Sequence, residues 1–164
     1  IMLALLCVIG MFSIPLGANI KVSLQLLMVF IICLMLPSAL DCIFITALYL
    51  LLGLFMPIYA GFNAGITPTF GYVISFVIIS PIIFYVNKIP KIHPPIRMFV
   101  ACLLGLLVCY LIGTIFMMIY LNWSFKQTVL VSIVPYLPFD FAKIIIAILI
   151  VLILPKNLVL PNYH

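Results

Sequence analysis

Apolar residues occur along this chain in long uninterrupted runs, which prolines and small polar clusters separate. The runs are apolar on every side, so they show neither the alternation of a half-buried strand nor the polar lumen of a barrel. Such runs predict helices that cross a lipid bilayer, where a crossing needs roughly 20 mostly apolar residues. The predicted helices cover Ile1–Ile14, Leu24–Leu36, Ala39–Pro57, Thr69–Val86, Met98–Leu121 and Phe141–Leu154.

Composition places these helices in lipid. Of the 164 residues, 69% are apolar and 5% are charged, against roughly 25% charged in an average soluble domain. So few polar side chains could not cover a soluble protein of this length. We therefore predict an all-α integral membrane protein, in which residues 1–164 form one compact bundle of six transmembrane helices. The first, second and last runs are short, and the chain begins at Ile1 rather than Met, which leaves open a truncated N-terminus.

The basic residues predict the orientation, because cytoplasmic connections carry an excess of Lys and Arg. With six crossings, one side of the membrane receives Lys88, Lys91, Arg97 and Lys156. The other side receives Lys21 and Lys126. This bias predicts that both termini are cytoplasmic. The bases are too few and too scattered for a nucleic-acid surface.

Catalytic and metal-binding patterns are missing from the sequence. Its five cysteines are spread through apolar runs without a C-x-x-C pair, and its two histidines are His93 and His164. A metal site needs several convergent donors. The chain also has no G-x-x-x-x-G-K-[ST] or H-E-x-x-H pattern, and Asp41 and Asp140 are predicted at opposite membrane faces. We predict no enzyme activity, no metal and no cofactor.

The few polar residues are grouped. Three stretches are the informative ones: "KVSLQ" (Lys21 to Gln25), "GFNAGITPTFGY" (Gly61 to Tyr72) and "PFDFAK" (Pro138 to Lys143). All three map to the outer side of the six-helix arrangement. Polar groups that converge at one mouth are what a binding pocket open to the outside requires.

Asp140 and Lys143 are three residues apart, so a helix would place them on one face. Charges at membrane depth are costly, roughly 2.5–3.5 kcal/mol each at the bilayer centre and less near an interface. Two interpretations remain open. The pair either neutralises itself, with Lys143 reaching toward the headgroups, or it binds a ligand that carries amide-like groups or a carboxylate.

The glycines and the proline of "GFNAGITPTFGY" predict a non-helical connection. At membrane depth, such a backbone is tolerated only where protein buries it or where it lines a cavity. Asn63, Thr69 and Tyr72 would supply polar partners, while the apolar Phe62 and Phe70 would form the underside of a lid. The alternative is an ordinary connection in water.

Three stretches resemble the BioY family, the biotin-specific S components of energy-coupling factor (ECF) vitamin transporters. "SIPLGANIKVSLQLLMVF" (Ser13–Phe30) is similar to the family's I-P-L…T-L-Q-T-L segment. "LYLLLGLFMPIYAGFNAGITPTFGYVISF" (Leu48–Phe76) is similar to Y-L-L-L-G…P-V-F…G-P-T-G-G-Y, and "VPYLPFDFAKIIIA" (Val134–Ala147) to L-P-G-D-x-x-K-A. They follow the family order along the chain.

The resemblance implies binding of biotin from outside and its uptake through a bacterial cell membrane. It also implies a transmembrane T component and two ATPase subunits as partners. Asp140 would accept the ureido N–H groups, and Lys143 or Asn63 would meet the ureido carbonyl. The other candidate ligand-binding residues are Gln25, Tyr72, Thr69, Phe62 and Phe70.

The chain departs from the family pattern at two positions, because Phe70 and Phe139 stand where the family has glycine. Both changes fall close to the expected pocket. An S component for another vitamin, such as thiamine or riboflavin, therefore remains an alternative on the same fold. A purely structural subunit, in which Asp140 and Lys143 form a neutral pair, is the alternative from a different class.

Overall fold

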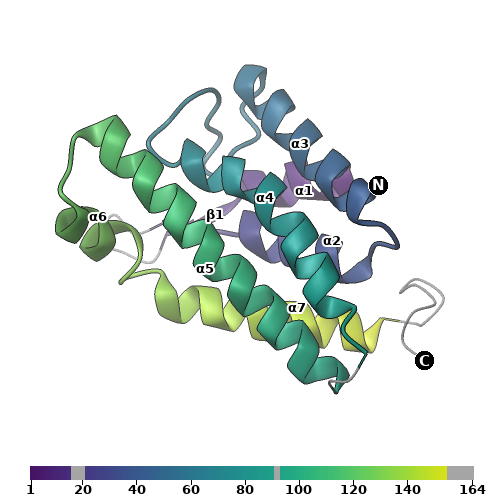
Figure 1. The fold of residues 1–164 in the computed structure, drawn as a ribbon. Helices are drawn as coiled ribbons and strands as arrows, with labels where there is room; N and C mark the ends of the chain where they lie inside the picture. The colour runs from purple at the N-terminus through teal and green to yellow at the C-terminus, as the bar shows by residue number, and fades with distance from the viewer. Residues whose placement is uncertain (16–20, 91–92, 155–164) are drawn as a thin grey trace.

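The computed structural model describes residues 1–15, 21–90 and 93–154, which form seven α-helices and one antiparallel two-stranded hairpin (Figure 1). The helices are α1 (Met2–Met11), α2 (Gln25–Met35), α3 (Ala39–Phe55), α4 (Phe70–Asn87), α5 (Pro94–Leu121), α6 (Phe125–Ser132) and α7 (Leu137–Ile153). The strands are β1 (Ser13–Pro15) and β2 (Lys21–Ser23), paired with Ser13 opposite Ser23.

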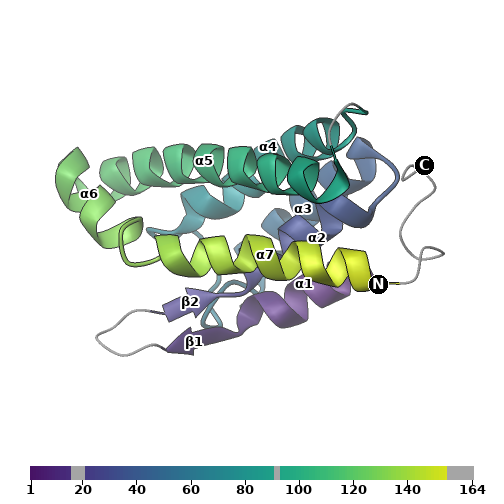
Figure 2. The same cartoon turned by 90° about the horizontal axis from the view of Figure 1, so that it is seen from below.

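Six of the helices run back and forth between two ends of the molecule, and α6 lies across one end (Figures 1 and 2). The hairpin and the start of α7 lie at the same end as α6, whereas the turn from α2 into α3 lies at the other. The all-helical membrane fold predicted from the apolar runs is confirmed, with the short hairpin as an addition. By length and composition, α4 and α5 can each cross a membrane, and α6 and α7 together form a third candidate, bent by 50°.

Two of the helices begin four residues earlier than the apolar runs predict, whereas the other predicted helices begin within one residue of the prediction. α5 starts at Pro94 rather than Met98, and α7 starts at Leu137 rather than Phe141. In both cases prolines occupy the first turn, where their missing N–H breaks no helical hydrogen bond. Asp140 therefore lies in the first turn of α7, where the positive end of the helix dipole favours a carboxylate.

Helix α6 was not predicted. Its first turn is held by a capping box, in which the Ser124 hydroxyl accepts from the Gln127 N–H and the Gln127 side chain accepts from the Ser124 N–H. The S-x-x-Q spacing that marks such a box is visible in the sequence. The apolar pattern did not reveal the helix because it is only 8 residues long.

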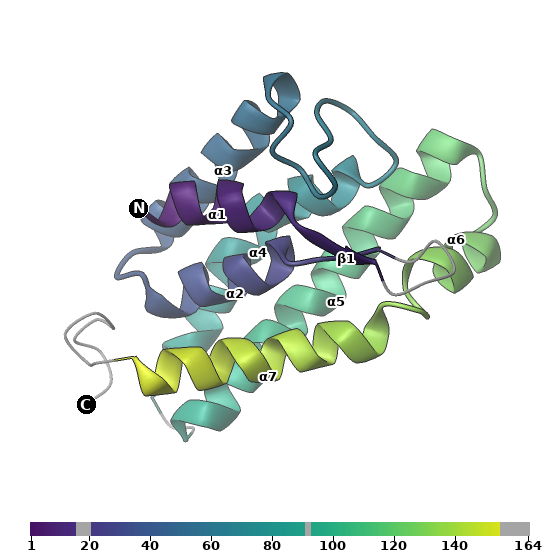
Figure 3. The same ribbon diagram turned by 180° about the vertical axis from the view of Figure 1, so that it is seen from behind.

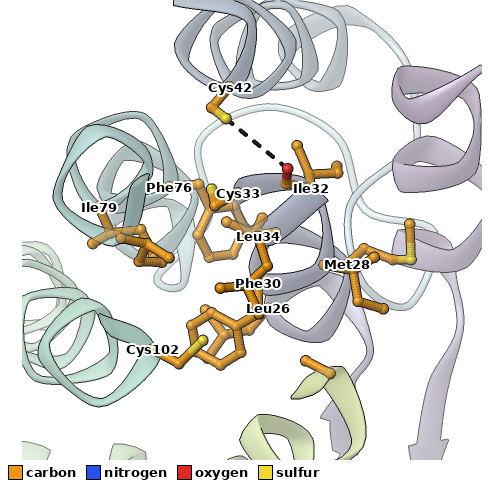
Figure 4. Packing of buried hydrophobic residues seen from close by; sticks show 14 of the residues in the cluster. Leu26, Met28, Phe30, Ile32, Cys33, Leu34, Cys42, Phe76, Ile79 and Cys102 are labelled. Atoms are coloured by element: carbon orange, nitrogen blue, oxygen red, sulfur yellow. Dashed lines mark hydrogen bonds between the residues drawn. The ribbon is translucent and has the colours of Figure 1, made fainter. Parts of the chain in front are cut away.

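The core of the bundle is built around α2, in which every residue except Leu27 is buried. Figure 4 shows side chains of α2 between Phe76 and Ile79 of α4, Cys102 of α5 and Cys42 of α3. The cysteines buried there, Cys33, Cys42 and Cys102, are free thiols that serve as small packing residues. A helix that is apolar on all sides is suited to such a central position.

Glycines bring α4 and α5 close together, as is usual where helices pack in a membrane. A Cβ atom on Gly113 would overlap the ring of Tyr72, and one on Gly71 would overlap Phe116. The opposite side of α5 is a stripe of exposed apolar residues, suited to lipid. The stripe consists of Leu104, Leu107, Leu111, Ile115 and Ile119.

We expect Gly113→Ala to lower stability by about 1–3 kcal/mol, because the added methyl group must displace a rigid aromatic ring. Gly105→Ala is the comparison on the same helix, since its Cβ would lie 2.7 Å from Ile83 Cδ1 and Cγ1, whereas a Cβ on Gly113 would lie 2.3 Å from Tyr72 ring atoms. Thermal unfolding of the purified variants in detergent measures both effects. Equal melting temperatures for the two variants would contradict this account of the α4–α5 contact.

Candidate functional site

A cavity of about 370 Å³ opens at the end of the bundle that carries the hairpin and α6. This volume lies within the usual range for small-molecule sites, roughly 300–1,000 Å³. The hairpin, the α3–α4 connection, α2, α4, α5, α6 and α7 all contribute to its wall. The lining residues are Ser13, Ser23, Gln25, Leu26, Ala60, Gly61, Asn63, Thr69, Tyr72, Phe76, Cys109, Tyr110, Met117, Val131, Ser132, Tyr136, Asp140 and Lys143.

A buried ion pair forms one side of the cavity. Lys143 Nζ lies 2.6 Å from Asp140 Oδ1, and the two side chains are 8% and 7% exposed. The second carboxylate oxygen, Oδ2, accepts a hydrogen bond of 2.6 Å from the Tyr110 hydroxyl on α5. An ionised carboxylate offers about four acceptor positions and an ammonium three donors. Both groups therefore keep hydrogen-bonding capacity for a ligand.

Gln25 faces the same cavity from the first turn of α2 and is buried. Its side-chain Nε2 donates to the Tyr49 hydroxyl at 2.5 Å. This bond holds the side chain at the cavity wall. The Gln25 carbonyl oxygen is left to accept a hydrogen bond.

The α3–α4 connection, residues 56–69, is non-helical as predicted. A tight turn joins Tyr59 and Asn63 through two backbone hydrogen bonds of 3.0 and 3.3 Å. Inside it, Gly61 and Phe62 have φ angles of 75° and 59°, a region that glycine adopts without a steric penalty but a bulky residue does not. The Gly61 N–H donates to the carbonyl of Met11 at the end of α1, at 3.0 Å. The connection is thus tied to α1, as Figure 3 shows from behind.

Three hydroxyl groups, one each on α4, α5 and α6, are buried next to one another and complete no hydrogen bond of good geometry among the described residues. They belong to Tyr72, Thr114 and Ser132, and all three oxygens are buried. Tyr72 and Ser132 line the cavity. Buried polar groups in native proteins nearly always have a partner. Hydroxyls left without one at a cavity wall are what a polar ligand or bound water would satisfy.

The structure brings six of the eight predicted site residues to the cavity: Asp140, Lys143, Gln25, Asn63, Thr69 and Tyr72. Asn63 and Thr69 are exposed, and their side chains also bond locally, to the Ala60 carbonyl at 2.8 Å and to the Thr67 hydroxyl at 3.1 Å.

Phe62 and Phe70 do not line the cavity. Phe62 is 63% exposed and contacts Phe12, with ring centroids 6.4 Å apart. Phe70 is buried between the rings of Tyr59 and Phe116, at 6.2 and 5.9 Å. The prediction that Phe62 and Phe70 form the apolar underside of a lid is therefore wrong, whereas closure of the connection over a ligand stays a prediction. The connection presents backbone and polar side chains to the cavity, because the left-handed backbone at position 62 turns that side chain outward.

Sequence reasoning missed several lining residues, notably Tyr110, Ser132 and Tyr136. Tyr110 lies in the middle of an apolar run, so no local pattern marks it. Only its contact with Asp140 across the bundle shows its role. Ser132 and Tyr136 flank the bend between α6 and α7, and recognising α6 by its capping box would have brought them into view.

The chemistry of the site is that of binding. Among the described residues, no three His, Cys, Asp or Glu side chains converge as metal ligands. The cavity offers a paired carboxylate and ammonium, amides and hydroxyls in an otherwise apolar wall. Polar groups of both kinds, few in number and fixed by packing, give a small molecule its orientation.

The fold and the cavity together define an integral membrane protein with a binding site for a small molecule at one end. The chain belongs to the BioY family, whose sequence profile matches residues 1–159. Membership makes it a transport protein and not an enzyme.

Two relatives support this assignment. The biotin transporter BioY of Thermotoga maritima is 27% identical over 158 residues, which cover 93% of this chain and 90% of that protein. The biotin transporter BioY2 of Lactococcus lactis is 30% identical over 154 residues, which cover 90% of this chain and 80% of that protein. The crystal structure of the S-component for biotin from an ECF-type ABC transporter has the same fold, with a TM-score of 0.77 at 24% identity over 91% of this chain and 84% of the other.

Removing one member of the ion pair should destabilise the protein far more than removing both. Lys143→Met leaves the Asp140 carboxylate buried without its counter-ion, which costs about 3–5 kcal/mol. Asp140→Leu combined with Lys143→Met replaces both charges by apolar groups and should restore most of that loss. Melting temperatures of the parent and both variants in detergent test this. A double variant as unstable as Lys143→Met would contradict a coupled pair.

Proposed function

We propose that this chain binds biotin on the extracellular side of a bacterial cell membrane and takes it up as the S component of an ECF transporter. Membership of the BioY family carries the proposal, together with a cavity of suitable size beside a buried ion pair. Both relatives are biotin transporters. We also propose that residues 1–164 act as one substrate-binding domain.

The groups at the cavity wall suit the chemistry of biotin. The ureido ring of biotin has two N–H donors and one carbonyl acceptor, its thiophane ring is apolar, and its tail ends in a carboxylate. Asp140 retains acceptor positions for ureido N–H groups, and Lys143 retains N–H donors for the carbonyl. Gln25, Asn63, Thr69 and Tyr72 are the further proposed ligand-binding residues.

The proposed orientation places the cavity outside and both termini in the cytoplasm. Lys88 and Arg97 lie at the end of the bundle opposite the cavity, where α4 ends and α5 begins. Lys126 lies in α6 at the cavity end, and β2 begins there at Lys21. Lys91 and Lys156, the other two basic residues predicted on the cytoplasmic side, lie outside the described residues. Helix α1 begins and α7 ends at the same end of the bundle as Lys88 and Arg97, so the excess of basic residues expected in the cytoplasm is compatible with cytoplasmic termini.

Uptake needs an energy source that this sequence does not contain, since it lacks a phosphate-binding loop. We propose a transmembrane T component and two ATPase subunits as partners. Ala4 and Val8 occupy an exposed side of α1. A small exposed residue such as Ala4 permits the close approach of another helix, which makes α1 the proposed contact for the T component.

Phe70 and Phe139, which stand where the family has glycine, are the sequence feature that would favour a different vitamin as ligand. Neither Phe70 nor Phe139 lines the cavity. The substitutions therefore give no support to a reshaped pocket, and no other feature of the cavity favours thiamine or riboflavin.

Calorimetry with purified protein tests the ligand. We expect binding of biotin, and no binding of thiamine or riboflavin. Asp140→Leu combined with Lys143→Met should weaken biotin binding by at least about a hundredfold, because hydrogen bonds to charged groups contribute roughly 1.5–3 kcal/mol each. Phe139→Ala is the matched control, since it changes α7 next to Asp140 without touching the cavity. Biotin binding that survives in the double variant would contradict the assigned roles.

Ligand binding should also close the α3–α4 connection over the cavity. Residues 61–71 should exchange their amide hydrogens more slowly when biotin is bound, because ordered backbone hydrogen bonds protect against exchange. Hydrogen exchange measured by mass spectrometry at saturating biotin checks this, with α5 peptides as an internal reference. If exchange in this segment stays the same while biotin is bound, the connection is not a lid.

A further inference from the structure

Tyr49 connects the cavity to the α3–α4 connection without lining the cavity itself. The residue lies in α3 and is 0% exposed. Its hydroxyl accepts a hydrogen bond from Gln25 Nε2 at 2.5 Å and donates one to the Ile58 carbonyl at 2.9 Å. Gln25 belongs to the cavity wall, and Ile58 lies near the start of the connection. The buried hydroxyl oxygen of Tyr49 therefore links the cavity wall to the α3–α4 connection.

The hydrogens of this network fix the orientation of the Gln25 amide. A phenol has a single hydrogen to donate, and the Ile58 carbonyl can only accept. The Tyr49 hydrogen is therefore used in the bond to Ile58, and Gln25 must supply the hydrogen of the other bond. Its NH₂ group points to Tyr49, which leaves the Gln25 carbonyl oxygen as the atom available to a ligand.

The packing around Tyr49 leaves its hydroxyl little room to move. A Cβ atom on Gly10 of α1 would lie 2.7 Å from the hydroxyl oxygen. The Tyr49 ring packs edge-on against Tyr59, with centroids 5.7 Å apart. Tyr59 is fixed in turn, since its hydroxyl donates to the Leu50 carbonyl at 2.6 Å, and its burial raises the pKa of the phenol to about 12, which keeps that donor protonated.

We propose that Tyr49 is a positioning residue with two effects. It holds the Gln25 carbonyl oxygen so that this atom accepts an N–H group of the ligand, and it couples the state of Gln25 to residues 56–69 through Ile58. The first effect rests on the proposed function for the identity of the ligand. The second is a property of the unliganded protein. Coupling of this kind is reciprocal, so a change at Gln25 must be felt in the connection.

Affinity for biotin tests the first effect. Tyr49→Phe keeps the ring and removes the hydroxyl, so biotin binding should weaken about threefold to tenfold, as expected for one hydrogen bond held less well. Tyr59→Phe is the matched control. It removes a phenol hydroxyl from the same cluster, but that hydroxyl contacts no cavity residue, so affinity should stay within about twofold of the parent.

A double-mutant cycle separates positioning from a general structural effect. In a Gln25→Ala background, Tyr49→Phe should cause no further loss of affinity, because the side chain that it positions is gone. If the fold-losses of biotin affinity caused by Tyr49→Phe and Gln25→Ala multiply in the double variant, the proposed positioning is overturned. A Tyr49→Phe variant with the affinity of the parent would overturn it as well. If Tyr49→Phe does not fold, Gly10→Ala takes its place: its Cβ would lie 2.7 Å from the Tyr49 hydroxyl and 3.3 Å from Gln25 Cγ, so it disturbs their contact from both sides. Affinity should then fall in the parent and stay unchanged in the Gln25→Ala background, and a fall in both would overturn the positioning.

Hydrogen exchange in the absence of ligand tests the second effect. Gln25→Ala should raise amide exchange across residues 56–69, because Tyr49 loses one of its two bonds. Unchanged exchange there would overturn the coupling. Failure of the parent to bind biotin would overturn the proposed function alone, and this ligand-free comparison would still decide whether Tyr49 joins the cavity to the connection.

Discussion

The binding site is organised around two opposite charges held together in an apolar interior. Asp140 and Lys143 are both buried, and their contact satisfies each charge where lipid and hydrocarbon side chains cannot. Such a pair is a weak source of stability, because the cost of removing both charges from water offsets most of their attraction. Packing alone would be served at least as well by two apolar residues. The position of the pair at the cavity wall gives the charges a second role, which is to bind polar groups of a solute.

The two ends of the bundle differ in structure, and the ion pair lies at the irregular end. One end of the bundle consists of helix ends and short turns. The other end carries the hairpin, the α3–α4 connection and the bent α6–α7 pair (Figure 2). Irregular backbone at membrane depth is tolerated where it lines a cavity, and here all three irregular segments contribute to the cavity wall. Their departure from helical structure thus serves the same site as the buried charges.

Much of this could be predicted from the sequence, because the lipid environment restricts a chain so apolar to helices. The grouping of scarce polar residues also indicated where the cavity lies, and the i,i+3 spacing indicated the contact of Asp140 with Lys143. Features that depend on long-range contacts could not be predicted. Tyr110 and Tyr49 lie within apolar runs, and their roles come only from partners on other elements. The outward position of Phe62 follows from a left-handed backbone angle that its residue type does not suggest.

The most direct test of the account is a structure of this protein determined with biotin bound. The account predicts that the ureido ring occupies the cavity between α2, α4 and α7, within hydrogen-bond distance of Asp140 or Lys143. Biotin bound elsewhere, or in the cavity with only apolar contacts to these elements, would contradict the claim that the buried charges are there to bind the solute.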